Sequence, residues 1–424
     1  MSARQTEFGA SGLYHFSQLS GNFPVRLHLR VDPDGSGLLL ANAAHAAHLS
    51  PVGVTMVHAA LEGLDDAEVV QEVQRAFAGG AVARVTSDLE GVRKLLADLL
   101  TPTDDYPVTN YGAPPDNHAP RRLMAPFQAY VTQGDPDTVA HLLRSLWDSG
   151  VPQATFLAQP ERPPEELVRL VECAEDLGMI TGLRAVAGRL PEGVLRDTGM
   201  AGLDFLKLVL LSADPAEHDG VLGAWDHAAF VEAVAACRDM ELCPVAQIPL
   251  TDGSADELPE LIDFALQHGI GTLEFFALAC LERASGEDLA GALPAQALPH
   301  VATQIAECAD DLGVRFLWAP PVRFEPRRSL GDQVVAGPRA GGDVSLRIEA
   351  DGTVFAPRGP REPCGNLLRQ PWDAIWRHPA FTRDREGAAA PARCPGCPGL
   401  EVCNAGCIKD PAGWSDDTNP GGAQ

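Results

Sequence analysis

Four cysteines near the C-terminus have the spacing of a metal-binding site. Cys394, Cys397, Cys403 and Cys407 follow the pattern C-x2-C-x5-C-x3-C, and Cys364 lies thirty residues upstream of the first. Thiolates at this spacing can converge on one ion or cluster, because the first pair forms a knuckle turn and a short loop returns the second pair. Zinc and a 4Fe-4S cluster use the same ligand type, so the spacing alone does not choose between them.

The other five cysteines are expected in the core. Each occurs singly among valine, alanine and leucine residues, where a free thiol is a small buried hydrophobe. They are Cys173, Cys237, Cys243, Cys280 and Cys308.

Other candidate side chains are expected to have structural roles and no catalytic or metal-binding role. His45 and His48 fall in a predicted strand, which places their rings on opposite faces, so a metal site there is not expected. The acidic residues Glu62, Asp65 and Asp66 are expected on solvated helix faces.

The composition describes a large globular protein with an acidic surface. The chain has 424 residues, 45% of them hydrophobic, and a formal net charge of −26. That charge repels phosphate backbones and anionic lipid, and no run of about 18 uncharged apolar residues occurs. Neither nucleic acid nor a membrane is expected as a partner.

The N-terminus lacks a signal-peptide pattern, so the expected location is cytoplasmic.

Residues 22–103 are expected to form a winged-helix-like domain after an N-terminal extension, residues 1–21. Short strands interrupted by the turn at Asp34-Gly35 precede three segments with helical periodicity. These helices are expected over 51–61, 65–77 and 88–100.

A proline-rich linker, residues 104–121, separates this domain from a series of strand-helix units over 122–340. Seven apolar strands alternate with helices, which is typical of a parallel α/β sheet, either doubly wound or forming a closed or partial barrel. Six strands could line a partial (β/α)6 barrel. Residues 341–410 form a cysteine-rich module, and 411–424 form a tail.

The cysteine-rich module resembles a known family. The turn at Asp351-Gly352, the Gly365-Asn366 pair, the helix at Trp376 and the four terminal cysteines are similar to the SPASM module. This module is the auxiliary iron-sulfur extension of radical SAM enzymes that modify peptides.

Two upstream regions extend the resemblance. The second to fourth strand-helix units are similar to a radical SAM core, including the turn at residues 212–215 and the following His218-Asp219. The first domain resembles the precursor-recognition element of ribosomal peptide maturation. The resemblance implies a radical SAM-like partial barrel and a precursor (leader) peptide as partner.

Two departures concern S-adenosylmethionine. The family carries C-x3-C-x2-C in the loop after the first barrel strand, but residues 128–135 contain no cysteine. At the end of the second strand, the family's Gly-Gly-Glu-Pro, which holds the amino group of the cofactor, is replaced by Ala158-Gln159-Pro160-Glu161. Binding and reductive cleavage of S-adenosylmethionine are therefore not expected, and no catalytic or cofactor-binding residue is assigned.

The SPASM resemblance implies one 4Fe-4S cluster, because five cysteines are too few for two full clusters. The set we favour is Cys394, Cys397, Cys403 and Cys407. In the alternative set, the first three bind with a carboxylate from the tail, and Cys407 and Cys364 are not ligands. The candidate carboxylates are Asp410, Asp416 and Asp417.

These features predict a pseudoenzyme of peptide maturation. It would bind a precursor peptide by strand addition at Ala46, Ala47, His48 and Leu49, beside the third helix. It would present the peptide to an active radical SAM homologue or another maturation enzyme. Two alternatives stay open: an active enzyme that uses S-adenosylmethionine or another ligand without the three-cysteine cluster, and a metal-stabilised scaffold for a catalytic partner.

Overall fold

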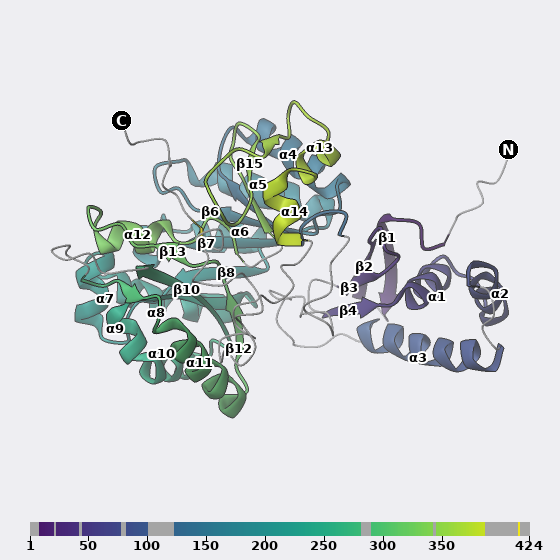
Figure 1. The fold of residues 1–424 in the computed structure, drawn as a ribbon, viewed down its shortest axis with the longest axis horizontal. Helices are drawn as coiled ribbons and strands as arrows, with labels where there is room; N and C mark the ends of the chain where they lie inside the picture. The colour runs from purple at the N-terminus through teal and green to yellow at the C-terminus, as the bar shows by residue number, and fades with distance from the viewer. Residues whose placement is uncertain are drawn as a thin grey trace. The chain divides into compact units, whose positions relative to one another are not determined.

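The computed structural model describes residues 8–20, 23–41, 45–77, 82–100, 123–280, 290–341, 345–385 and 414–415. The chain divides into two compact units. The first contains strands β1 to β4 and helices α1 to α3, and the second contains the elements from β5 onward (Figure 1).

The first unit contains a four-stranded antiparallel sheet in the order β1-β2-β3-β4. Alternate residues of β2, such as Leu27 and Leu29, are fully buried on the face that packs against the helices. The strands are β1 (Gly12–Ser20), β2 (Phe23–Val31), β3 (Gly37–Ala41) and β4 (His45–Leu49).

Strand β1 lies within the segment that the sequence predicted as an extension, residues 1–21. That prediction is wrong for Gly12–Ser20, which pairs with β2 along its whole length. Tyr14 and Phe16 pack against the buried face of the sheet, and they alternate with polar residues as a half-buried strand requires. The sheet therefore has four strands instead of three.

Three helices follow this sheet, as the periodicity predicts. Helices α1 and α3 pack against the sheet, and α2 packs against these two helices. Helix α2 begins with a capping box, in which Asp65 and Glu68 each accept a hydrogen bond of 2.9 Å from the other's backbone N–H. The third helix begins earlier than expected, because Val85 continues the apolar series of Leu89 onto the other helices. The helices are α1 (Pro51–Leu61), α2 (Asp66–Ala76) and α3 (Val82–Leu100).

The second unit contains a parallel sheet whose strands follow one another in chain order, from β5 to β10. A doubly wound sheet would reverse this order at a switch point, so the sequential order identifies the partial-barrel alternative. These strands are β5 (Gln128–Thr132), β6 (Gln153–Leu157), β7 (Ile180–Ala185), β8 (Phe205–Val209), β9 (Cys243–Leu250) and β10 (Thr272–Cys280).

Short strands extend both edges of the parallel sheet. At one edge, three strands pair in parallel with β10: β11 (Leu293–Pro294), β12 (Arg315–Trp318) and β13 (Val322–Arg323). At the other, β14 (Ser345–Ile348) pairs in parallel with β5 and continues into β15 (Thr353–Phe355) and β16 (Gly365–Asn366). The pairings of the described residues do not close the sheet into a barrel.

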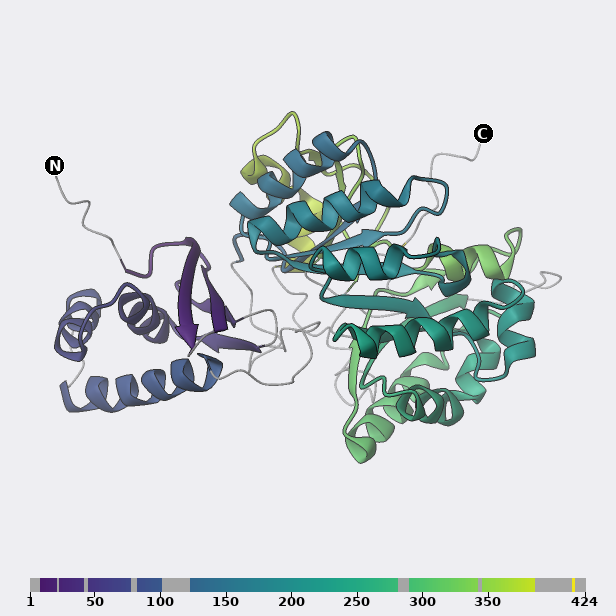
Figure 2. The same cartoon turned by 180° about the vertical axis from the view of Figure 1, so that it is seen from behind.

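Amphipathic helices connect the strands (Figure 1; Figure 2 gives the view from behind). In α4, for example, Val139, Leu142, Leu143 and Leu146 form one fully buried stripe. The helices are α4 (Pro136–Asp148), α5 (Pro164–Leu177), η1 (Ala187–Arg189), α6 (Val194–Met200), α7 (Pro215–Leu222), α8 (Asp226–Asp239), α9 (Asp252–Asp256), α10 (Leu258–Gln267), α11 (Leu298–Leu312), α12 (Leu330–Ala336), α13 (Trp372–Trp376) and α14 (Pro379–Arg385). Within the described ranges, no helix has both the length and the apolar character needed to cross a membrane.

Candidate functional site

The residues predicted to bind the cluster fall almost entirely outside the described residues. Only Cys364 is described: it lies directly before β16 and is buried, with its thiol 3.8 Å from the carbonyl oxygen of Glu362. No group of three or more metal-ligating side chains occurs in the part of the chain that the structure describes. The residues outside it are Cys394, Cys397, Cys403, Cys407, Asp410, Asp416 and Asp417.

The isolated cysteines occupy the positions of core residues. Cys237, Cys243 and Cys280 are buried, and Cys173 and Cys308 are partly buried. Burial raises the pKa of both Cys237 and Cys243 to about 12, so these two are neutral thiols at pH 7. Neither is suited to act as a nucleophile or a metal ligand.

The loop after β5 is too short for the family's cluster motif. Only Gln133, Gly134 and Asp135 separate β5 from α4, whereas C-x3-C-x2-C occupies eight positions. The backbone N–H of Gln159 donates to Gln133 Oε1 at 2.8 Å, and Asp135 Oδ2 accepts from the N–H and hydroxyl of Thr138 at 3.0 and 2.8 Å. The residues present therefore do not fit the cluster that activates S-adenosylmethionine.

The loop after β6 is tied to the loop after β5. Its residues, Ala158-Gln159-Pro160-Glu161, stand where the family has Gly-Gly-Glu-Pro. The backbone of Ala158 donates to the carbonyl of Arg184, and Gln159 is bonded to Gln133 as described above. A side chain at position 158 prevents the close backbone approach that a glycine allows. Both altered loops are thus parts of one hydrogen-bonded arrangement.

Five polar side chains meet inside the parallel sheet. Lys207 Nζ donates to Glu274 Oε2 at 2.5 Å and to the hydroxyl of Tyr130 at 3.0 Å. Gln247 donates to Glu274 Oε1 at 2.5 Å and accepts from Arg184 Nε at 2.7 Å. The five come from β5, β7, β8, β9 and β10, so the network joins strands that are far apart in the sequence.

The network contains the ion pair of Lys207 and Glu274, the guanidinium of Arg184, and two neutral partners, Tyr130 and Gln247. Burial by itself lowers the pKa of Lys207, but the carboxylate of Glu274 and the hydroxyl of Tyr130 raise it above its ordinary value. Burial, followed by the charge of Glu274, raises the pKa of Tyr130. The lysine is therefore protonated and the tyrosine neutral at pH 7, so Lys207 is not available as a base or nucleophile.

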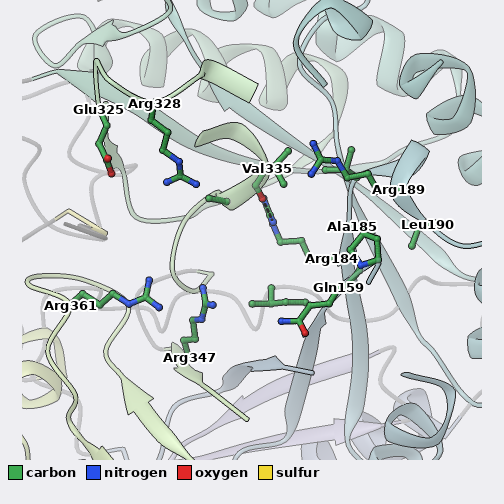
Figure 3. Close-up of a pocket in the computed structure, with 15 residues that line it drawn as sticks. Gln159, Arg184, Ala185, Arg189, Leu190, Glu325, Arg328, Val335, Arg347 and Arg361 are labelled. Carbon is green, nitrogen blue, oxygen red and sulfur yellow. Dashed lines mark hydrogen bonds between the residues drawn. The ribbon is translucent and has the colours of Figure 1, made fainter. Parts of the chain in front are cut away.

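A cavity of about 740 Å³ lies at the carboxyl ends of β6 and β7. Its lining includes Gln159 and Pro160 of the altered loop, together with Arg184 and Val335 (Figure 3). Arg184 is fixed at this wall, because its guanidinium donates to the backbone carbonyls of Val334 and Val335 at 3.3 and 2.8 Å. The cavity therefore occupies the carboxyl-end position where open parallel sheets bind ligands.

The turn after β8 has a structural role. Asp214 caps α7 by accepting from the N–H of Glu217 at 3.2 Å. Buried His218 Nε2 lies 2.9 Å from Asp226 Oδ2, and Asp226 Oδ1 accepts from the N–H of Gly188 at 2.6 Å. These bonds join η1, α7 and α8, so His218 is held by neighbouring elements and does not face the cavity lining described above.

The predicted peptide-binding residues, Ala46 to Leu49, lie together on β4. This strand pairs with β3 and forms one end of the four-stranded order among the described residues. Ala46 and Ala47 are partly buried, His48 is exposed, and Leu49 packs in the same core cluster as Leu96 of α3. The structure thus places these residues on an edge strand next to the third helix, as strand addition requires.

Solved structures share this fold. A crystal structure of Streptococcus suis SuiB bound to S-adenosylmethionine matches 96% of this chain and 99% of its own, with 12% identity and a TM-score of 0.56. SuiB bound to the precursor peptide SuiA matches 95% and 99%, with 13% identity and a TM-score of 0.53. The fold is that of a radical SAM/SPASM protein.

Curated proteins of similar sequence indicate the same class of protein. The PqqA peptide cyclase of Xanthomonas campestris pv. campestris is 28% identical over 286 residues, which cover 63% of this chain and 71% of the relative. The PqqA peptide cyclase of Streptomyces rochei is 25% identical over 283 residues, 63% and 73% of the two chains. No protein-family profile matches the chain. The resemblance to radical SAM proteins of peptide maturation is confirmed.

The SuiB complex also bears on the cofactor. A radical SAM/SPASM fold has been solved with S-adenosylmethionine bound, so the fold itself accommodates this molecule. The expectation that it does not bind here rests on the two altered loops of this chain and stays a prediction.

The polar network and the cavity were not predicted from the sequence. A signal was present, because long polar side chains interrupt the apolar runs of these strands, as Lys207 does in FLKLV and Glu274 in TLEFFALAC. In a strand buried on both faces, such a residue must find a partner inside the protein. The strand order is needed to see that these partners are one another.

Proposed function

We propose that this chain is a precursor-peptide-binding protein of peptide maturation whose radical SAM-like sheet lacks the cluster that cleaves S-adenosylmethionine. Its similarity to PqqA peptide cyclases and to SuiB supports the peptide as partner. It retains one 4Fe-4S cluster at the C-terminal cysteines. Its role is to present the peptide to a catalytic partner, such as an active radical SAM homologue.

The observation that carries this proposal is the loop of three residues between β5 and α4. An iron-sulfur cluster with an open iron needs three thiolates in that place, and Gln133, Gly134 and Asp135 supply none. Their polar atoms are engaged in capping α4 and in bonding the loop after β6.

The test is the formation of 5′-deoxyadenosine. Anaerobically purified protein is mixed with S-adenosylmethionine, dithionite and a precursor peptide encoded beside its gene, and the product is quantified by mass spectrometry. We expect no product above that of a protein-free control. Product that disappears in the variant Cys394→Ala/Cys397→Ala would overturn the proposal and favour an active enzyme.

A further inference from the structure

Five arginines line the cavity at the carboxyl ends of β6 and β7, together with a single carboxylate, that of Glu325. The whole chain has 32 basic and 58 acidic side chains, so a site with five cations and one anion departs strongly from the protein's average. Arginine stays charged at every physiological pH. The lining arginines are Arg184, Arg189, Arg328, Arg347 and Arg361.

Two of these arginines share one carboxylate. Glu349 Oε1 lies 2.9 Å from Arg347 Nε and 3.2 Å from a terminal nitrogen of Arg361. The other oxygen of Glu349 accepts from the hydroxyl of Thr132 at 2.7 Å. One carboxylate therefore holds both guanidinium groups at this side of the cavity.

Two others pair with no carboxylate within the described residues. Arg328 donates to the backbone carbonyl of Asp332 at 3.0 Å, and Arg189 is exposed at the end of η1. Figure 3 shows Arg328, Arg347 and Arg361 directed toward the space between them. Like charges held together in this way repel one another unless an anion lies between them.

The backbone is adapted to this arrangement at Gly337. This residue ends α12 with φ of +57°, a conformation that favours glycine, and a Cβ there would overlap the Arg184 guanidinium. Position 337 thus leaves room for the buried Arg184 at the cavity wall.

We propose that this cavity binds a small polyanion, a ligand that carries at least two phosphate or carboxylate groups. A volume of about 740 Å³ is in the range of small-molecule sites. Guanidinium groups from different elements can each form charge-assisted, bidentate bonds to such groups. The sulfonium of S-adenosylmethionine would instead be repelled by the same arginines.

The inference is independent of the proposed function. It concerns the wall formed by β6, β7 and the segments around Arg328 and Arg347, and neither the C-terminal cluster nor the edge strand of the first unit is needed for it. Absence of 5′-deoxyadenosine would leave it standing, and absence of anion binding would leave the proposed function standing.

The test is titration calorimetry of the full chain with three ligands. Pyrophosphate and citrate show whether the cavity prefers phosphate or carboxylate groups, and acetate is the comparison with a single charge. The variant Arg189→Gln/Arg328→Gln removes two cavity charges that no described carboxylate pairs with. The control Arg169→Gln/Arg196→Gln removes two exposed charges from α5 and α6, which form only surface ion pairs.

We expect saturable binding of pyrophosphate or citrate and none of acetate. The dissociation constant should rise about tenfold or more in the cavity variant and stay within about twofold in the control. The unfolding temperature without ligand should be the same in both variants, so a folding defect is distinguished from lost binding. Failure of both polyanions to bind the wild-type chain, or an equal loss in both variants, would overturn the proposal.

Discussion

Lys207 and Glu274 form an ion pair within the sheet, with side chains that are 1% and 3% exposed. Two charges removed from water are stable only as a pair with further hydrogen bonds, which Tyr130 and Gln247 supply. Removing one partner leaves the other charge uncompensated. The pair therefore specifies which strands meet, even if it adds little net stability.

The variant Lys207→Met is expected to lower the free energy of unfolding by about 3–5 kcal/mol, because it leaves the buried carboxylate of Glu274 without the compensating charge of the lysine. Adding Glu274→Gln should recover most of this loss, since the amide keeps an acceptor for Gln247 and carries no charge. Urea unfolding followed by tryptophan fluorescence measures both. As a control, Arg169→Gln breaks an exposed ion pair and should change stability by less than about 1 kcal/mol. A Lys207→Met variant as stable as this control would contradict the account.

At the scale of elements, β1 and β2 carry a histidine pair in which His28 is buried and His15 is exposed. His15 and His28 are directly opposite in the register, and their Nδ1 atoms lie 2.9 Å apart. Burial, then the charges of His15 and Arg26, lowers the pKa of His28 to about 4. The folded sheet therefore favours the neutral imidazole.

This pair makes the first unit less stable in acid. The unfolded chain binds a proton at His28 with a pKa of about 6.5, whereas the folded chain does so only near 4, so stability falls as the pH drops through this interval. At pH 5 the loss is about 2 kcal/mol. Hydrogen exchange of β2 amides in the full chain, corrected for intrinsic rates, measures it. The variant His28→Leu should remove most of the effect, and the variant His141→Gln, at an exposed position of α4, should not. Equal slopes in all three proteins would refute the assignment.

Two single proline variants, at Ala46 and at Ala47, test whether the edge strand β4 binds the precursor peptide. Successive backbone N–H groups of a strand point to opposite edges, so of Ala46 and Ala47 one N–H faces β3 and the other faces outward. Proline at the inward position should destabilise the sheet. Proline at the outward position should leave stability unchanged and weaken precursor-peptide binding, measured by fluorescence anisotropy, by about tenfold. Undiminished binding by the stable variant would place the peptide elsewhere.

At the scale of the whole molecule, the cysteine pattern predicts a single cluster in each chain. Anaerobically purified protein should contain about four irons with a brown charge-transfer absorption. The variant Cys394→Ala/Cys397→Ala should abolish this absorption, whereas Cys173→Ala/Cys308→Ala, at two isolated and partly buried positions, should retain it. Two clusters per chain, or one zinc without iron, would contradict the prediction.

Periodicity and turn residues were sufficient to predict a parallel sheet and the three helices of the first unit, whereas the sequential strand order was expected only from the family resemblance. Strand β1 was missed although its sequence carries a signal, because Tyr14 and Phe16 alternate with polar residues and Gly21-Asn22 follows as turn residues. The polar network could not be predicted from single strands, since Arg184 and Gln247 are 63 residues apart and meet only because β7, β8 and β9 are neighbours. The arginine-lined cavity likewise combines side chains from opposite ends of the second unit's sequence.

The three-residue connection between β5 and α4 also limits how this protein could change. Introducing cysteines by substitution at Gln133, Gly134 and Asp135 would remove the cap of α4 and the bond to the next loop, and it would still leave the thiols too close in sequence for the family's spacing. A side chain at Gly134 would in addition overlap Ala350. On the proposed function, recovery of the family's chemistry would require an insertion of several residues as well as substitutions. Such a lineage would not revert by point mutation, and selection would act on what its members bind.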